Sequence, residues 1–184
     1  MSTEMTDTET ATAARSMCKD APCLPRLIVD TREQTPLTFP HLEAVRGTLA
    51  TGDYSIAGME GAFMVERKSV QDLVGSLTQG RERFFRELER MRAAQCARLL
   101  IVGQAVDMAA HLNRRSVNAE SIAGSLAAIN SRFVPVVWAA TPAKAAQMVE
   151  RLAVYFWAGA ARPFIGRVEV PAWAREGVLD NWKG

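Results

Sequence analysis

The chain has 184 residues, of which 48% are hydrophobic and 23% charged, and its formal net charge is +2. Its length suits one domain with a single core and is too short for two domains of ordinary size. No apolar run approaches the roughly 20 residues that a transmembrane helix needs, so we expect no membrane association, and the composition excludes a wholly disordered chain.

Residues 1–25 are rich in Thr, Ala and acidic residues, and we expect a disordered tail there. This segment has neither the basic start nor the apolar stretch of a secretory signal. The cysteines Cys18, Cys23 and Cys96 are odd in number and lack metal-ligand spacing, which argues against a disulfide framework or a zinc site. We therefore expect a cytoplasmic or nucleoid-associated protein. The tail carries a net charge of −2, and the +4 on the remaining chain permits nucleic-acid binding without requiring it.

The first expected strand, residues 27–29, is short, continuously apolar and followed by Asp30. A polar, proline-containing loop comes next. Residues 45–58 and 61–69 have strand patterns joined by a Gly-containing turn, which indicates a β-hairpin.

Helical periodicity governs much of the remaining chain. Ser69 is a suitable N-cap for the helix that follows it. The next helix, residues 80–94, has one apolar face and is expected to gather Arg83, Arg86 and Arg90 on another, a stripe that either contacts phosphate groups or is simply solvated. The order is strand, hairpin, two helices, strand, two helices, strand and helix, which predicts an α/β domain with a mixed sheet flanked by helices. The other expected elements are helices over residues 70–77, 118–133 and 141–162 and buried strands over residues 97–103 and 134–140.

Three consecutive charged residues, Glu66, Arg67 and Lys68, lie near the end of the second hairpin strand. A strand whose end merely emerges into water also carries charged residues there. Whether these three charges mark a functional site or only a solvated strand end therefore depends on whether other acidic residues reach the same place. Side chains two positions apart on a strand face the same side, so Glu66 and Lys68 should point together while Arg67 points away.

Acidic residues also lie at or beside the other expected strand ends, namely Asp30, Glu33 and Asp53. If the hairpin brings these ends close to Glu66, the carboxylates share one edge of the sheet and repel one another unless a cation neutralises them. Carboxylate ligands without His or Cys nearby suit magnesium or manganese. A carboxylate pair, Lys68 and a divalent ion are the parts needed to generate a hydroxide and orient it toward a phosphodiester.

The spacing of these residues resembles a known signature. Gly52 and Asp53 are followed, after twelve residues, by Glu66, Arg67 and Lys68, and Asp72 comes after three more. This pattern resembles the signature of the XPF family of structure-selective DNA endonucleases, and the neighbouring segments "IVDTRE" and "DLVGSLTQGR" resemble the family's flanking blocks. A weaker likeness extends the resemblance over residues 26–161. It implies a restriction-endonuclease-like fold, with a nuclease domain over residues 26–161 and a C-terminal extension over residues 162–184.

The resemblance also implies roles for the residues of the motif. Asp53 and Glu66 would ligate Mg²⁺ or Mn²⁺ together with the backbone carbonyl of Arg67, and Lys68 would position or activate the attacking water. Asp30 and Glu33 correspond to acidic positions that line the same pocket.

The basic residues Arg32 and Arg81 correspond to family positions near the pocket, and Arg67, Arg83 and Arg86 are further candidates for DNA binding. Gly52 would support the site. Asp72 would either do the same or act only as a cap for the helix that begins after Ser69.

The function implied is that of a magnesium-dependent DNA endonuclease acting on branched or flapped DNA in repair or recombination. A non-catalytic DNA-binding partner subunit is a second possibility, but such family members characteristically lose motif residues and none is lost here. A nuclease acting on RNA is a third, because a phosphodiester site does not itself read the sugar.

Family members usually carry a tandem helix-hairpin-helix domain and act as dimers. Residues 162–184 are too few to fold as that domain, since segments below about 40 residues seldom fold alone. Whether a partner protein supplies the helix-hairpin-helix domain stays open. The helix over residues 152–161 is apolar almost all round. Either the C-terminal extension alone or a second subunit must cover it, and we favour a homodimer to which the extension contributes. A heterodimer stays open.

Overall fold

The computed structural model describes residues 24–165 and 169–175 of the chain. The expected disordered tail falls almost wholly outside the described residues, as do residues 166–168 and 176–184 of the expected extension. None of the helices in the described ranges combines the length and the apolar character that crossing a membrane requires.

The centre of the molecule is a six-stranded mixed sheet with the order β2-β1-β3-β4-β5-β6. Strands β1 and β2 are parallel, β1, β3 and β4 alternate in direction, and β4, β5 and β6 are parallel. This confirms the expected α/β fold with a mixed sheet. The strands are β1 (Leu27–Asp30), β2 (Ala44–Gly47), β3 (Tyr54–Ile56), β4 (Phe63–Ser69), β5 (Cys96–Val102) and β6 (Val136–Ala139).

The segment expected as one strand over residues 45–58 is in fact two strands, β2 and β3, which lie on either side of β1. The chain leaves the sheet after Gly47, and the backbone amide of Leu49 then donates a 2.7 Å hydrogen bond to the carboxylate of Asp30. It returns at Gly52, whose φ of 82° reverses the chain. The hairpin of β3 and β4 is confirmed.

Helices α2, α5 and α6 begin where the sequence predicts, whereas α4 was expected without a position. The side chains of Ser69 and Asn118 accept hydrogen bonds from first-turn amides of α2 and α5, and that of Thr141 accepts one from the Lys144 amide at the start of α6. Two helices separate β5 from β6, as expected. Helix α6 continues past residue 161, the expected domain boundary. The helices are α2 (Val70–Thr78), α3 (Arg81–Met91), α4 (Ala105–Arg115), α5 (Ala119–Arg132), α6 (Pro142–Ile165) and α7 (Ala172–Arg175).

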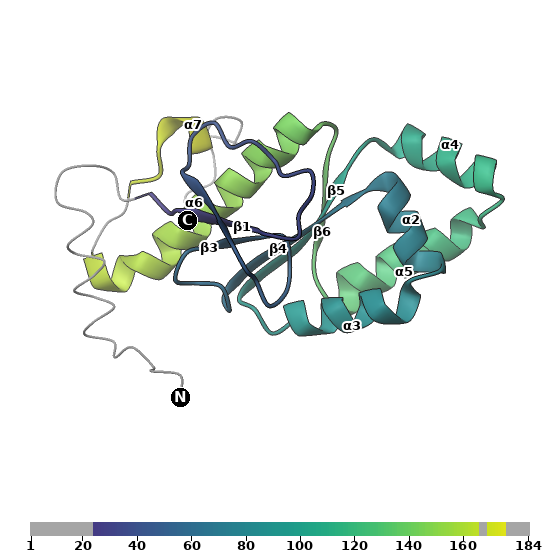
Figure 1. Cartoon of the computed structure of the whole chain (residues 1–184), viewed down its shortest axis with the longest axis horizontal. Helices are drawn as coiled ribbons and strands as arrows, with labels where there is room; N and C mark the ends of the chain where they lie inside the picture. The colour runs from purple at the N-terminus through teal and green to yellow at the C-terminus, as the bar shows by residue number, and fades with distance from the viewer. Residues whose placement is uncertain (1–23, 166–168, 176–184) are drawn as a thin grey trace.

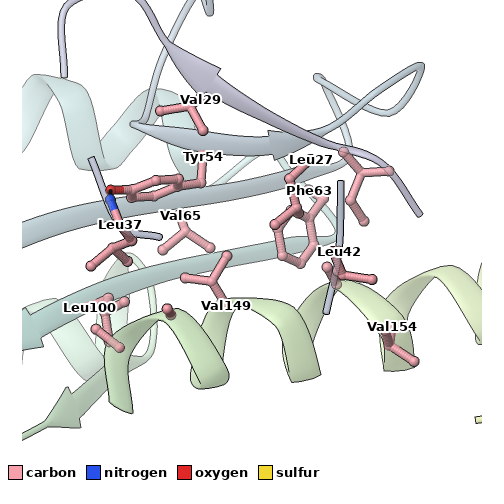
Figure 2. Packing of buried hydrophobic residues seen from close by; sticks show 14 of the residues in the cluster. Leu27, Val29, Leu37, Leu42, Tyr54, Phe63, Val65, Leu100, Val149 and Val154 are labelled. Carbon is pink, nitrogen blue, oxygen red and sulfur yellow. Dashed lines mark hydrogen bonds between the residues drawn. The ribbon is translucent and has the colours of Figure 1, made fainter. Parts of the chain in front are cut away.

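Two hydrophobic cores cover the two faces of the sheet. Helix α6 packs on one face, and α2 to α5 gather at the right of the view in Figure 1 and pack on the other. Strand β5 shows the alternation: Leu99 and Ile101 belong to the core with α2 to α5, whereas Leu100 belongs to the core with α6. Figure 2 shows the α6 side, where Val149 faces the buried side chains of the strands.

Part of the C-terminal extension packs against the domain. Trp173 of α7 stacks on His41 with ring centroids 4.2 Å apart, and Ala174 is fully buried. The same cluster includes the partly buried Trp157 of α6. Some of the excess apolar surface of α6 is therefore covered by the chain's own extension.

Candidate active site

Strand β4 presents its charged residues to opposite faces of the sheet. Phe63 and Val65 point toward α6, so Arg67 shares their side, whereas Glu66 and Lys68 point toward α2 and α3. In keeping with this division, Glu66 and Lys68 line a cavity of about 290 Å³ beside α3, and Arg67 does not. As predicted, Glu66 and Lys68 share one face of the sheet and Arg67 lies on the other.

Asp53 reaches the same cavity from the residue before β3. Gly52 precedes it with a positive φ, and a Cβ at Gly52 would lie 3.2 Å from the carbonyl oxygen of Val65, so only glycine fits there without displacing backbone. The Asp53 amide donates to the Val65 carbonyl at 2.9 Å, and the Arg67 amide donates to Asp53 Oδ2 at 2.8 Å. These contacts fix the Asp53 carboxylate beside Glu66.

Burial and mutual repulsion set the protonation of this pair of carboxylates. Burial raises the pKa of Asp53 to about 6, and the negative charge of Glu33 adds to the increase. Burial raises the pKa of Glu66 to about 8, with a further contribution from the charge of Asp53. Glu66 is only 3% exposed. Two carboxylates held this way favour a bound cation.

In the structure, Lys68 supplies the positive charge nearest to this pair. Its ammonium group forms an ion pair with Glu66 Oε1, and its side chain is 19% exposed. Burial lowers the pKa of Lys68, but the attraction of Glu66, Glu87 and Asp53 outweighs that effect and leaves the pKa raised. The ammonium group lies 5.6 Å from the ring centre of Phe84, which packs beneath it.

Asp30 lines the cavity, but its oxygens are already engaged. They accept hydrogen bonds from the amide and guanidinium of Arg32 and from the Leu49 amide. The side-chain bond from Arg32 is the main reason that the pKa of Asp30 falls to about 2. The side chain of Arg32 is 67% exposed at the rim of the cavity. Asp30 thus anchors Arg32 and the Leu49 loop.

Glu33 is held by Arg67 and does not line the cavity. Two nitrogens of the Arg67 guanidinium lie 3.1 and 3.2 Å from the two Glu33 oxygens, and the Thr35 amide donates to the same carboxylate. Both side chains are largely buried, at 16% and 7% exposed. Because Arg67 leaves β4 on the side opposite Glu66, this pair braces the site from behind.

Helix α3 forms one wall of the cavity. Arg83, Glu87 and Arg90 line the cavity, and Arg90 donates to the Thr51 hydroxyl at 3.3 Å. Arg86 instead lines a shallow depression with Glu82, Phe85 and Glu89. Of the predicted arginine stripe, Arg83 and Arg90 line the cavity and Arg86 does not, and the role of the stripe in binding phosphate groups stays a prediction. In the sequence, the spacing of Arg83, Glu87 and Arg90 already places them on one face of the helix, and this is the face that lines the cavity.

Arg81 and Asp72 have local contacts. Arg81 donates to Ser125 Oγ at 2.8 Å and stacks on Phe85 at 4.6 Å from guanidinium to ring centre, so it ties α3 to α5. Asp72 bonds reciprocally with Ser69 through its amide and its carboxylate, which is the geometry of a helix cap. Neither residue lines the cavity described above.

The donor set at this cavity fits a hard divalent cation. Asp53 and Glu66 offer carboxylate oxygens, and the Arg67 carbonyl, the third predicted ligand, belongs to the same strand. No group of three or more His, Cys, Asp or Glu side chains with metal-binding geometry occurs among the described residues. Mg²⁺ is commonly held by one or two carboxylates while it keeps several waters, so two carboxylates and a carbonyl suffice.

Comparison with known protein families decides the family. Residues 29–152 match the ERCC4 domain. The chain belongs to the ERCC4 domain family. The matched range of this ERCC4 domain includes every residue of the cavity described above. No curated protein matches the chain significantly.

Solved structures similar to this ERCC4 domain show the same fold. XPF from Aeropyrum pernix in complex with DNA is 24% identical, with a TM-score of 0.59 over 76% of this chain and 66% of that one. Another structure of XPF from Aeropyrum pernix is 24% identical, with a TM-score of 0.57 over 72% of this chain and 61% of that one. The chain thus spans slightly less than two thirds of these structures. The expected XPF-like, restriction-endonuclease-like fold is confirmed.

Proposed function

We propose that this ERCC4 domain is a magnesium-dependent DNA endonuclease that hydrolyses phosphodiester bonds. The observation that carries the proposal is the convergence of Asp53, Glu66 and Lys68 on one cavity, with Arg32 and Arg83 at its edge. Two carboxylates, one ammonium group and two guanidinium groups are what a phosphodiester hydrolase needs around the scissile phosphate. Membership of the ERCC4 domain family supports the same function.

Asp53 and Glu66 would hold the metal with the Arg67 carbonyl, and a bound Mg²⁺ supplies charge neutralisation and a more acidic water. Lys68, whose pKa is raised, keeps its proton and so donates hydrogen bonds to the water or the phosphate. Arg32 uses Nε and Nη2 to hold Asp30 and the Leu49 carbonyl, so its Nη1 remains available to a phosphate on the exposed side. Arg83 approaches from α3.

Purified protein incubated with linear, flapped, forked and single-stranded DNA, with and without Mg²⁺, tests this function. We expect cleavage only with the divalent cation, and preferential cleavage of the branched substrates. An RNA strand of the same sequence belongs in the same assay. Cleavage of RNA alone, or no cleavage of any substrate, would overturn the assignment as a DNA endonuclease.

A homodimer through α6 remains the favoured assembly. Tyr155 of α6 is 43% exposed, whereas Trp157 packs against the core, so Tyr155 is the better candidate for an interface. We expect Tyr155→Glu to shift the protein toward monomer in light scattering at micromolar concentration. Ala143→Glu, at the exposed start of the same helix, adds the same single negative charge and is the control. A wild-type monomer, or a dimer unaffected by Tyr155→Glu, would contradict this assembly.

A further inference from the structure

A second and larger hollow adjoins the catalytic cavity. Its volume is about 850 Å³, and helices α2, α3 and α4 line it. We call it the α2–α4 groove; its walls include Gly75, Arg83, His111 and Arg115. Lys68 and Arg83 line both the groove and the catalytic cavity, so a chain molecule bound at one continues directly into the other.

The two arginine side chains of the groove, unlike Lys68, have no partner within the described part of the chain. The side chains of Arg83 and Arg115 take part in no hydrogen bond or ion pair there, in contrast to Arg67 and Arg81, which are held by Glu33 and Ser125. Asp72 is the one carboxylate on the walls, and the Ser69 hydroxyl already donates to it. The groove therefore offers two unengaged guanidinium groups, which suit phosphate oxygens.

His111 gives an independent indication of a ligand. It is 7% exposed, yet its ring makes no hydrogen bond to any described residue. No fully buried side-chain nitrogen or oxygen in the described chain lacks a partner, so the ring nitrogens of His111 must remain reachable from the groove. A nearly buried polar ring with one open side suits a ligand that brings hydrogen-bonding groups of its own.

The α2 wall is open at Gly75. A Cβ added at Gly75 would meet nothing within 4 Å, although glycine inside a helix costs about 1 kcal/mol relative to alanine. Helix α3 also starts at the groove, because its N-cap Gly80 is on the wall and no side chain caps the first turn. Free first-turn amides at a helix N-terminus attract phosphate.

We propose that the α2–α4 groove binds a single nucleic-acid strand next to the scissile phosphate, with Arg83 and Arg115 on successive phosphates and His111 on a base or sugar. The proposal rests on the proposed function for the identity of the ligand. A hollow of this size takes a few nucleotides of one strand. The walls are polar and basic, so they grip the backbone without selecting a sequence.

Fluorescence anisotropy in excess chelator measures this binding without cleavage. The probes are a fluorescein-labelled oligothymidylate of about 12 nucleotides and a blunt duplex of equal length. We expect Arg115→Ala to weaken single-strand binding about fivefold and to lower the salt slope by about one phosphate contact. Arg114→Ala, which removes the neighbouring arginine of α4 that is not on the groove wall, should change neither.

Gly75→Glu adds bulk and negative charge to the groove and should weaken single-strand binding about tenfold. Gly75→Ala adds a methyl group where there is open space and should bind as the wild type does. Glutamate and alanine both favour helix, so neither change should unfold α2, and circular dichroism checks this. If Gly75→Glu does not fold, the comparison of Arg115→Ala with Arg114→Ala decides.

The proposal is overturned if the wild type binds the duplex as tightly as the single strand, or fails to bind the single strand. It is also overturned if Arg115→Ala binds as Arg114→Ala does. A wild type that binds the strand through this groove yet cleaves no DNA with Mg²⁺ would instead remove the proposed nuclease function alone. The two failures are thus distinguishable.

Discussion

Replacing Glu66 by glutamine should stabilise the protein while it abolishes cleavage. The side chain is 3% exposed and lies beside Asp53, so its ionised form loses hydration and meets a like charge. Glutamine keeps the size and an oxygen that accepts a hydrogen bond from Lys68. The variant leaves one carboxylate, that of Asp53, beside one ammonium group, that of Lys68, so the two charges cancel.

The magnitude follows from the pKa of Glu66, which rises from 4.5 to about 8. A pKa raised in the folded state means that stability is fully present below pH 4.5 and is lost as the pH rises through 8. Each unit corresponds to about 1.4 kcal/mol, which sets an upper limit of about 5 kcal/mol above pH 8. The attraction of Lys68 is already part of this pKa, and relaxation and water around the site reduce the limit. We therefore expect Glu66→Gln to gain about 2 kcal/mol at pH 8, or about 6 °C in Tm.

Thermal melting in excess chelator, recorded from acid to alkaline pH, measures the gain. The difference between Glu66→Gln and the wild type should be small at acid pH and should grow toward pH 8. Added Mg²⁺ should raise the Tm of the wild type more than that of the variant, so the difference in Tm between the two proteins should shrink. Glu89→Gln, at a side chain of α3 that is 58% exposed, is the matched control and should change Tm little.

Two results would refute this reasoning. One is a Glu66→Gln protein that melts below the wild type at pH 8 without metal, since that would mean that the ion pair with Lys68 outweighs burial and repulsion. The other is a difference in Tm that does not depend on pH, since a titrating carboxylate would then not be its cause.

Three further substitutions separate the roles of the basic residues. Lys68→Ala should lower kcat by about two orders of magnitude with little loss of DNA affinity, in single-turnover and binding assays; equal losses in both would reduce Lys68 to a phosphate contact. Arg67→Ala should lower the free energy of unfolding by about 3 kcal/mol in urea titrations, because it leaves the buried Glu33 unpaired; an unchanged midpoint would contradict the bracing role. Arg81→Ala should cost about 1 kcal/mol of stability and leave DNA affinity unchanged, because its partners are Ser125 and Phe85; weaker binding with unchanged stability would restore it as a DNA contact.

Local patterns were sufficient to predict most of the secondary structure. The caps Ser69, Asn118 and Thr141 lie at the expected helix starts because capping depends on residues close in sequence. The separation of β2 from β3 was missed because the loop between them is held by the long-range bond from Leu49 to Asp30, which no local pattern reveals.

The site was predictable only in part for the same reason. Strand alternation separates Glu66 from Arg67 in the sequence itself. The pairing of Arg67 with Glu33 required knowledge of how the loop after β1 folds over the sheet. Likewise, Glu87 was missed because helical spacing defines a polar face but not which edge of that face the sheet meets.

The most direct test of the central claim is cleavage of a labelled forked DNA by the wild type and by Asp53→Asn, with Mg²⁺ and with excess chelator. Asparagine keeps the hydrogen bond from the Arg67 amide and removes only the charge. We predict cleavage by the wild type with Mg²⁺ alone, and DNA binding without cleavage by the variant. Cleavage in excess chelator, or undiminished cleavage by Asp53→Asn, would contradict a metal-dependent nuclease centred on Asp53 and Glu66.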